Sequence, residues 1–101
     1  MRIITKRRLD EVAARHPQAR SVIAHWHAVA KSATWRHLPD TRATFPHADQ
    51  VSVKSGGIVT VFNLTNDFRL ITAIHYNRQT VFILCVLTHA DYTRGHWRND
   101  L

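Results

Sequence analysis

The feature that most constrains the fold is an uninterrupted run of seven apolar residues near the C-terminus, Val81 to Leu87. Its length and its β-branched content are typical of a buried strand, and it is too short to cross a membrane. The run stops at Thr88, and the chemically capable side chains of His89 and Tyr92 follow it. We therefore predict a rigid strand that delivers a histidine and a tyrosine to the edge of a sheet.

The N-terminal third predicts two helices after a short strand at Arg2 to Ile4. Thr5 reads as the N-cap of the first helix, and Pro17 suits the first turn of the second, where its missing N–H needs no partner. We expect the two helices to form a hairpin that covers one face of a sheet. Apolar residues recur at helical spacing in both segments, at Leu9, Val12 and Ala13 and then at Val22, Ile23, Trp26, Val29, Ala30 and Ala33.

Strand and turn signals dominate the second half of the chain. Residues 34–48 contain two prolines and predict a loop with one helical turn near Pro39 to Ala43. Gly56-Gly57 is a hairpin turn signal, and Thr65-Asn66-Asp67 supplies another turn. Successive strands joined by such turns form an antiparallel meander, so the fold class is α+β. The expected strands are Val51–Lys54, Ile58–Asn63, Phe68–Tyr76 and Thr80–Thr88.

The length of 101 residues predicts one domain, spanning residues 1–101. Residues 93–101 are polar and basic and contain Gly95, which predicts a mobile tail. The N-terminus has neither a long apolar region nor a small-residue cleavage pattern, so we expect no secretory signal. The single cysteine, Cys85, lies inside the apolar run, where a thiol acts as a small hydrophobe. These features suit a reducing cytoplasm.

The charge balance indicates an anionic partner. The net charge is +7, and eleven of the fourteen basic residues are Arg. Arginine matches phosphate in two-point contacts, so nucleic acid is the natural partner class. An anionic membrane surface is disfavoured because no helix combines a basic face with a bulky apolar face. The alternative is that the basic charge only aids solubility.

Several familiar site types are excluded by the residues present. A single Glu leaves little for paired-carboxylate catalysis, and no phosphate-binding loop or dinucleotide glycine pattern occurs. His25 and His27 are two apart on a predicted helix and so point in different directions, which prevents them from gripping one metal ion together. We therefore expect neither a metal nor a small-molecule cofactor.

Basic and aromatic side chains of the second half remain as candidates. Arg69 and His75 are six apart in one predicted strand, so they share a face, and His89 follows the adjacent strand. Such a group could cleave RNA without a metal, because the ribose 2′-OH is itself a nucleophile. The protein then supplies a proton acceptor, a proton donor and cations for the phosphate. The candidates are Lys54, Arg69, His75, Arg78, His89 and Tyr92.

The chain resembles the HigB toxins of bacterial toxin–antitoxin systems, within the RelE-like superfamily of ribosome-dependent mRNA interferases. The resemblance extends to about residue 92, and its most specific parts are the Thr88–Tyr92 segment THADY and the pair formed by Asn63 and Arg69. Less specific matches are the opening MRIIT, the helices ending near Ala30-Lys31, the Phe45-Pro46 pair, the hairpin from Val61 to Ile71, and the strand end at Leu87.

This resemblance implies a RelE-like fold, with an N-terminal strand and a two-helix hairpin packed on a curved, mainly antiparallel sheet of about four strands. It implies metal-independent mRNA cleavage in the ribosomal A site, leaving a 2′,3′-cyclic phosphate or a 3′-phosphate. It also implies rRNA contacts and a cognate helix-turn-helix antitoxin that silences the toxin. The motif positions carried over are Asn63, Arg69, His89 and Tyr92.

Each candidate also has a structural interpretation. Arg69 binds phosphate or forms an internal ion pair, with Asp67 or Asp91 among the possible partners. His89 transfers a proton, or it bonds a neighbouring carbonyl or caps the following helix. Tyr92 acts on RNA or anchors the C-terminal turn. His75 acts on RNA or is a half-buried residue of the sheet. Lys54 and Arg78 stabilise phosphate charge or only occupy turns, and Arg94 and Arg98 bind RNA phosphate or have no role.

We expect a ribosome-dependent mRNA endoribonuclease in which Arg69, helped by Lys54, steadies the phosphate while His89 and Tyr92 transfer protons or orient the substrate. One alternative is a noncatalytic RNA- or ribosome-binding module. A second is a relative of the ParE toxins, which share the superfamily fold but inhibit DNA gyrase.

Overall fold

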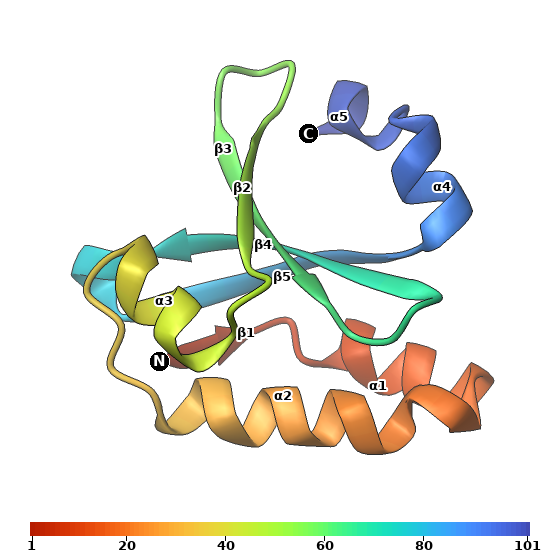
Figure 1. Ribbon diagram of the computed structural model, residues 1–101, viewed down its shortest axis with the longest axis horizontal. Coiled ribbons are helices and arrows are strands. Elements are labelled where there is room, and N and C mark those ends of the chain that lie inside the picture. The colour runs from red at the N-terminus through yellow and green to blue at the C-terminus, as the bar shows by residue number, and fades with distance from the viewer.

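The computed structural model describes residues 1–101 and contains ten regular elements in an α+β arrangement. A short strand and two helices come first, and a third helix leads into a meander of four strands followed by two short helices (Figure 1). In chain order the elements are β1 (Arg2–Ile4), α1 (Arg7–Arg15), α2 (Arg20–Ser32), α3 (Leu38–Thr44), β2 (Asp49–Ser52), β3 (Ile58–Asn63), β4 (Phe68–His75), β5 (Thr80–Thr88), α4 (His89–Arg94) and α5 (Trp97–Asp100).

The five strands form one sheet in the order β1-β5-β4-β3-β2. The meander from β2 to β5 is antiparallel throughout, as the turn signals predicted. The sheet has five strands rather than about four because β1 joins it, pairing in parallel with the first residues of β5. A parallel pair needs a long crossover connection, and the helices between β1 and β5 belong to that connection.

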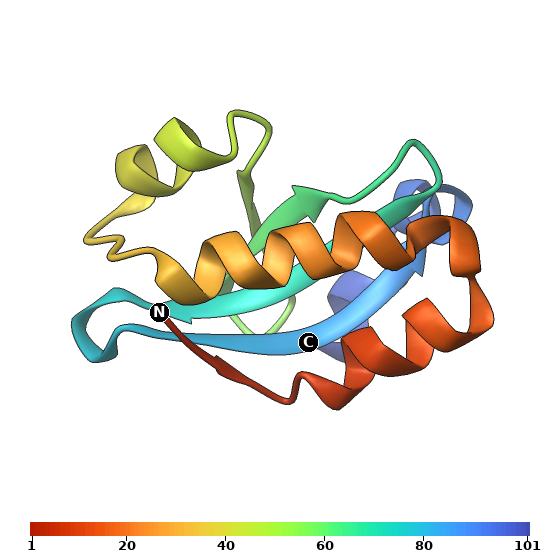
Figure 2. The ribbon, with the colours of Figure 1, turned by 90° about the horizontal axis from the view of Figure 1, so that it is seen from below.

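Helices α1 and α2 cover one face of the sheet, which confirms the predicted helical cover (Figure 2). The main core lies between these two helices and the sheet. It includes Leu9, Ile23, Trp26, Phe62 and Leu70, all at most 5% exposed. The apolar face of α2 therefore packs against the sheet, as the spacing of its apolar residues predicted.

Trp35, in the loop between α2 and α3, belongs to the core. Its side chain is 2% exposed and its ring stacks on Phe62 at a centroid distance of 6.1 Å. Its Nε1–H donates to Thr44 Oγ1 over 3.1 Å, which satisfies the one polar group of the ring. The Trp35 side chain therefore fixes the loop to the core. The polar residues that flank Trp35 gave no sign of this burial.

A β-bulge in β5 divides the apolar run between the two faces of the sheet. The register with β4 passes from Ile83 to Cys85 and leaves Leu84 without a partner. Before the bulge Ile83 packs among the helices, whereas after it Val86 does so and Leu87 packs on the opposite face. An extra residue of this kind reverses the alternation of a strand. The run is therefore apolar without interruption because each of its faces meets a hydrophobic cluster.

A second hydrophobic cluster covers that opposite face and includes the C-terminal residues. Trp97 is 6% exposed and packs with Val59, Val61 and Ile71. The backbone N–H of Lys54 donates to the Arg98 carbonyl over 2.9 Å. Residues 93–101 therefore form the end of α4 and all of α5, where the sequence predicted a mobile tail, because Trp97 supplies an apolar anchor.

The N-cap of α1 also differs from the sequence prediction. Thr5 adopts a left-handed conformation with φ of 67°, and Lys6 occupies the cap position without a side-chain hydrogen bond. The chain must turn sharply between β1 and α1, and the Thr5 carbonyl accepts the amide of Arg8 in the first turn of the helix. None of the helices combines the length and the apolar character that a membrane span requires.

Candidate active site

Three neighbouring strands place Asn63, Arg69 and Leu87 in one row on the sheet face that lies opposite α1 and α2. Asn63 is paired with Arg69 across β3 and β4, and Arg69 is paired with Leu87 across β4 and β5. Directly opposed residues of antiparallel strands lie on the same face with their Cβ atoms about 5 Å apart. The two motif residues Asn63 and Arg69 are therefore neighbours in space.

The Arg69 guanidinium holds the β3–β4 turn with one arm and reaches His89 with the other. Its Nη1 donates to the carbonyls of Thr65 at 2.8 Å and Phe68 at 3.0 Å. Its Nη2 lies 3.2 Å from Nδ1 of His89. This is the only hydrogen bond between two of the side chains that were proposed as catalytic from the sequence.

Arg69 has no carboxylate partner, which removes the ion pair considered from the sequence. Of its two candidate partners, Asp91 pairs with Arg94 at 3.3 Å, and Asp67 takes part in none of the four ion pairs. The backbone carbonyls that Arg69 binds carry only partial charge. Its full positive charge remains available to an anionic ligand.

His89 is the first residue of α4, and two backbone interactions hold it at the end of β5. The Thr88 hydroxyl accepts the N–H of Asp91 over 3.2 Å, so Thr88 and not His89 caps the helix. The His89 amide donates to the Asp67 carbonyl over 2.7 Å. The exposed imidazole is therefore free of the capping role that the sequence left open for it.

The contact with Arg69 assigns roles to the two ring nitrogens of His89. A guanidinium has donors only, so Nδ1 is the acceptor in this hydrogen bond and Nε2 is the nitrogen that carries a proton. The Nδ1 lone pair of His89 therefore faces Arg69.

The Tyr92 side chain anchors α4, the helix to which it belongs. Its ring is half-buried and stacks on Trp97 at a centroid distance of 5.4 Å, and its carbonyl accepts Trp97 Nε1–H over 3.0 Å. Tyr92 lies three residues after His89, so the two side chains occupy adjacent positions on the helix. The ring therefore ties the helix that presents His89 to the second hydrophobic cluster.

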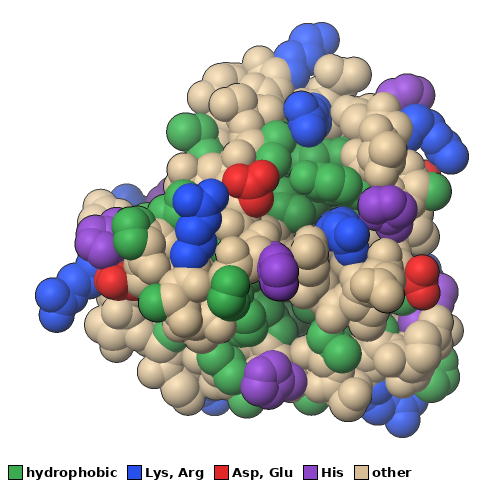
Figure 3. Space-filling view, in the orientation of Figure 1, with side chains coloured by type: hydrophobic (Ala, Val, Ile, Leu, Met, Phe, Trp, Pro, Cys, Tyr) green, Lys and Arg blue, Asp and Glu red, His purple; other side chains and the backbone are tan.

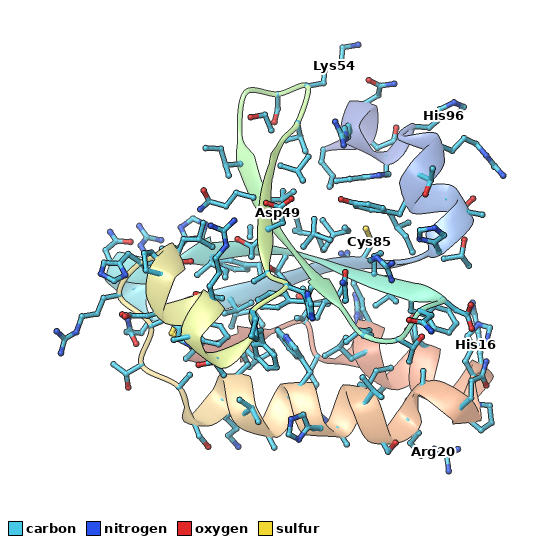
Figure 4. The ribbon with its side chains drawn as sticks, viewed as in Figure 1. His16, Arg20, Asp49, Lys54, Cys85 and His96 are labelled. Carbon is cyan, nitrogen blue, oxygen red and sulfur yellow. The ribbon has the colours of Figure 1, made fainter.

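Lys54 lies beside Arg98 of the C-terminal segment, and Arg94 ends the short helix that begins at His89. Lys54 is exposed next to the tip of the β2–β3 hairpin (Figure 4). Asn63 lies at the other end of β3, about 17 Å along the strand. Arg98 sits over the Trp97 ring at 5.6 Å, and Arg94 is exposed in its pair with Asp91.

The structure does not bring His75 and Arg78 to the same site. His75 shares a sheet face with Arg69, as predicted, but it lies six residues along β4, which corresponds to about 20 Å. Its ring meets the edge of Phe82 at 5.1 Å. Arg78 is exposed in the 3-10 turn that joins β4 to β5. Both lie at the end of the sheet distant from His89.

An apolar surface patch lies between the tip of the β2–β3 hairpin and the C-terminal helices. Figure 3 shows hydrophobic side chains there, with basic and histidine side chains at the margins. The partly buried Leu84, Cys85 and Leu87 belong to the cluster beneath it. Burial raises the pKa of the Cys85 thiol, against an opposing effect of Arg8. Cys85 is therefore a poor nucleophile at neutral pH, and its side chain packs as a small apolar group.

Two residues that support this site were not identified from the sequence. Thr88 was read as part of the THADY segment, although a threonine three residues before an acidic residue is itself a helix-start signal. Trp97 lay in the segment predicted to be mobile, and its only signal was an isolated aromatic in a polar stretch. No group of three His, Cys, Asp or Glu side chains gathers in a way that could hold a metal ion.

The chain matches a known protein family over most of its length. A family model described as the HigB toxin, the RelE-like toxic component of a toxin–antitoxin system, matches residues 19–95. No curated protein matches the chain. The matched range contains the hairpin, the β3–β4 turn, β5 and the whole of α4.

Proposed function

This chain belongs to the HigB family of toxins, the RelE-like toxic components of toxin–antitoxin systems, and from that premise we propose that it is an endoribonuclease that cleaves mRNA on the translating ribosome. Its substrate is the phosphodiester of a translated message, and its effect is arrest of translation and growth. A cognate antitoxin neutralises it.

The observation that carries this proposal is the Arg69–His89 pair. A guanidinium without a carboxylate partner lies 3.2 Å from an imidazole nitrogen, at the end of adjacent strands and beside Asn63. Phosphodiester cleavage by the 2′-OH requires a cation for the phosphate and a base for the hydroxyl proton. These two groups meet both needs within one contact.

We infer the following sequence of events. The scissile phosphate draws the free arm of Arg69 away from His89 and exposes the Nδ1 lone pair. Nδ1 then accepts the 2′-OH proton, the 2′-oxygen bonds to phosphorus, and the bond to the 5′-oxygen breaks. The leaving oxygen takes its proton from Tyr92 or from water. The products are a 2′,3′-cyclic phosphate and a 5′-hydroxyl.

Other side chains contribute to binding in this proposal. Asn63, beside Arg69, orients the ribose or the phosphate. Lys54, Arg94 and Arg98 contact the RNA backbone on either side of the C-terminal helices. His75 and Arg78 serve RNA that extends past the distant end of the sheet.

The chemistry can be tested by the ends of the products in a purified translation system programmed with a defined mRNA. We expect 2′,3′-cyclic phosphate and 5′-hydroxyl ends, and no cleavage when the nucleotide 5′ to the cut carries a 2′-deoxyribose. A 5′-phosphate with a 3′-hydroxyl would exclude 2′-OH attack. Stalled but intact mRNA would identify a noncatalytic binder instead.

The residues can be tested by growth arrest and primer extension in bacteria expressing variants. Arg69→Ala and His89→Gln should each restore growth and remove the codon-register cuts. The matched controls are Arg36→Ala and His25→Gln, whose side chains are exposed elsewhere and make no hydrogen bond or ion pair. Undiminished toxicity of both folded site variants would refute the assignment of this pair.

A further inference from the structure

The helix-covered side of the molecule carries a groove that the proposed cleavage chemistry does not use. One hollow of about 410 Å³ is lined by β1, Lys6 and the C-terminal half of α2. A second hollow of about 210 Å³ lies between α1 and α2. Both are lined by Lys6 and His27, so the two hollows are neighbours, and together they are here called the α1–α2 groove. Figure 2 shows the two helices that border it.

Unpaired cations converge on this groove. Arg2 and Lys31 line its wider end and Arg20 its narrower end, and none of the three takes part in an ion pair. Lys6 lies in the middle and pairs with Asp10 at 3.2 Å in an exposed contact, which is worth little in water. The wider end therefore holds an excess of positive charge that the protein itself does not compensate.

The pKa of His27, which lines the groove, is affected by the same positive charges. Burial lowers its pKa, and the charges of Lys6 and Lys31 lower it further, whereas Asp10 has the opposite effect. The half-buried imidazole is thus held beside two cations that stay close to it. A carboxylate entering the groove would meet several positive groups at once.

The narrower end of the groove contains an apolar strip between its charged residues. Its walls include Leu9 and Ile23, together with the small side chains Ala13 and Ala24. A strip of small apolar residues beside a cationic patch is complementary to a peptide segment that carries both carboxylates and aliphatic side chains. Nucleic acid is the weaker fit, because no Phe, Tyr or Trp side chain lines the groove for base stacking and the apolar strip offers nothing to a phosphate backbone.

We propose that the α1–α2 groove is the docking site for an acidic, amphipathic segment of the antitoxin. This assignment rests on the toxin–antitoxin role of the proposed function. Carboxylates of the segment pair with Arg2, Lys31 and Lys6, and its aliphatic side chains lie along the strip between the two helices. The site is on the face of the sheet opposite Arg69, so this segment binds without contacting the catalytic pair.

The charges can be tested by double reversal, Arg2→Glu with Lys31→Glu. The matched control is Arg15→Glu with Arg36→Glu, which changes the net charge equally and also places one glutamate in the last turn of a helix, here α1. Affinity is measured by titrating the antitoxin, taken from the gene adjoining this one, into the chain in an Arg69→Ala background. We expect the groove variant to bind at least about tenfold more weakly, because like charges then face each other across the interface, and the control to bind as the parent does.

Ala24→Arg separates a peptide from a nucleic acid. Ala24 is exposed on α2, so the larger side chain is tolerated but fills the apolar strip. A docked peptide should be displaced, whereas affinity for a single-stranded oligoribonucleotide should stay equal or rise with the added cation. Loss of RNA affinity in the double reversal, with antitoxin binding intact, would assign the groove to RNA and overturn the proposal.

A growth assay separates this proposal from the cleavage proposal. With an otherwise active chain, the groove variant should arrest growth and cut mRNA as the parent does, but co-expressed antitoxin should no longer rescue the cells. Full rescue of the groove variant would overturn the docking site and leave the cleavage chemistry intact. Failure of the antitoxin to bind the parent would overturn it also, while the product ends would still report the chemistry.

Discussion

Arg69 performs two tasks with one planar fork, and substitution can separate them. Arg69→Ala removes the cation beside His89 and should slow cleavage about 10²–10³-fold, the usual effect of losing a preorganised transition-state donor. Arg69→Lys retains charge but not the fork, so it cannot serve both the turn carbonyls and a phosphate. We expect it to stay well below the parent rate in single-turnover cleavage, and a fully active lysine variant would contradict the two-point role.

Tyr92 offers a second test at the scale of one residue. Its ring packs on Trp97, whereas its hydroxyl makes no hydrogen bond within the protein. If the ring anchors α4, Tyr92→Phe should cleave mRNA at nearly the parent rate and Tyr92→Ala should be both less active and less stable. A general acid typically contributes 10²–10⁴-fold, so a loss of about that size in Tyr92→Phe would identify the hydroxyl as the proton donor.

At the scale of elements, α5 contributes to the site through Trp97. The indole fills the second hydrophobic cluster and donates to the Tyr92 carbonyl, which joins α5 to the helix that carries His89. Trp97→Ala should lower the free energy of unfolding by about 3 kcal/mol, the lower end for large aromatic truncations in a core. Urea unfolding monitors this loss. Trp97→Phe, which keeps most of the apolar contact, is the control and should lose much less.

Helix α2 carries a pH-dependent term through His27. Burial, then Lys6 and Lys31, lower its pKa below the ordinary 6.5. Folded His27 therefore binds its proton less tightly than unfolded His27, so its contribution to stability is complete above pH 6.5 and is lost as the pH falls through the lower folded value. Melting temperatures from pH 7.5 downwards should show the parent losing stability relative to His27→Gln below pH 6.5. Parallel curves for the two proteins would contradict this coupling.

At the scale of the whole molecule, charge compensation is sparse and favours a polyanion. Only three of the fourteen Lys and Arg side chains make an ion pair, namely Lys6, Arg42 and Arg94. Affinity for single-stranded RNA should therefore fall with salt, with a log–log slope of about −0.7 for each phosphate contact. Arg69→Ala should reduce the slope by about one contact, and Arg36→Ala should leave it unchanged. A flat salt response of the parent would refute electrostatic RNA binding.

Most of the fold could be predicted from local signals because its connections are short. The glycines at 56 and 57 and the polar turn before Phe68 each specify a turn without reference to the rest of the chain. The pairing of β1 with β5 could not be predicted, because it joins residues nearly eighty positions apart. The burial of Trp35 and Trp97 likewise depends on distant partners and leaves no periodic trace.

For the candidate site, the sequence by itself determined which residue types end the strands: Asn63 and Arg69 on either side of one turn, and His89 after the apolar run. Only the tertiary structure decided that Arg69 lies beside His89, that Thr88 takes the capping role, and that His75 is too distant to join them. The physical reason is that strand periodicity specifies a face, whereas proximity depends on register between strands. Here that register is set by the β4–β5 pairing and its bulge, which local residue preferences do not encode.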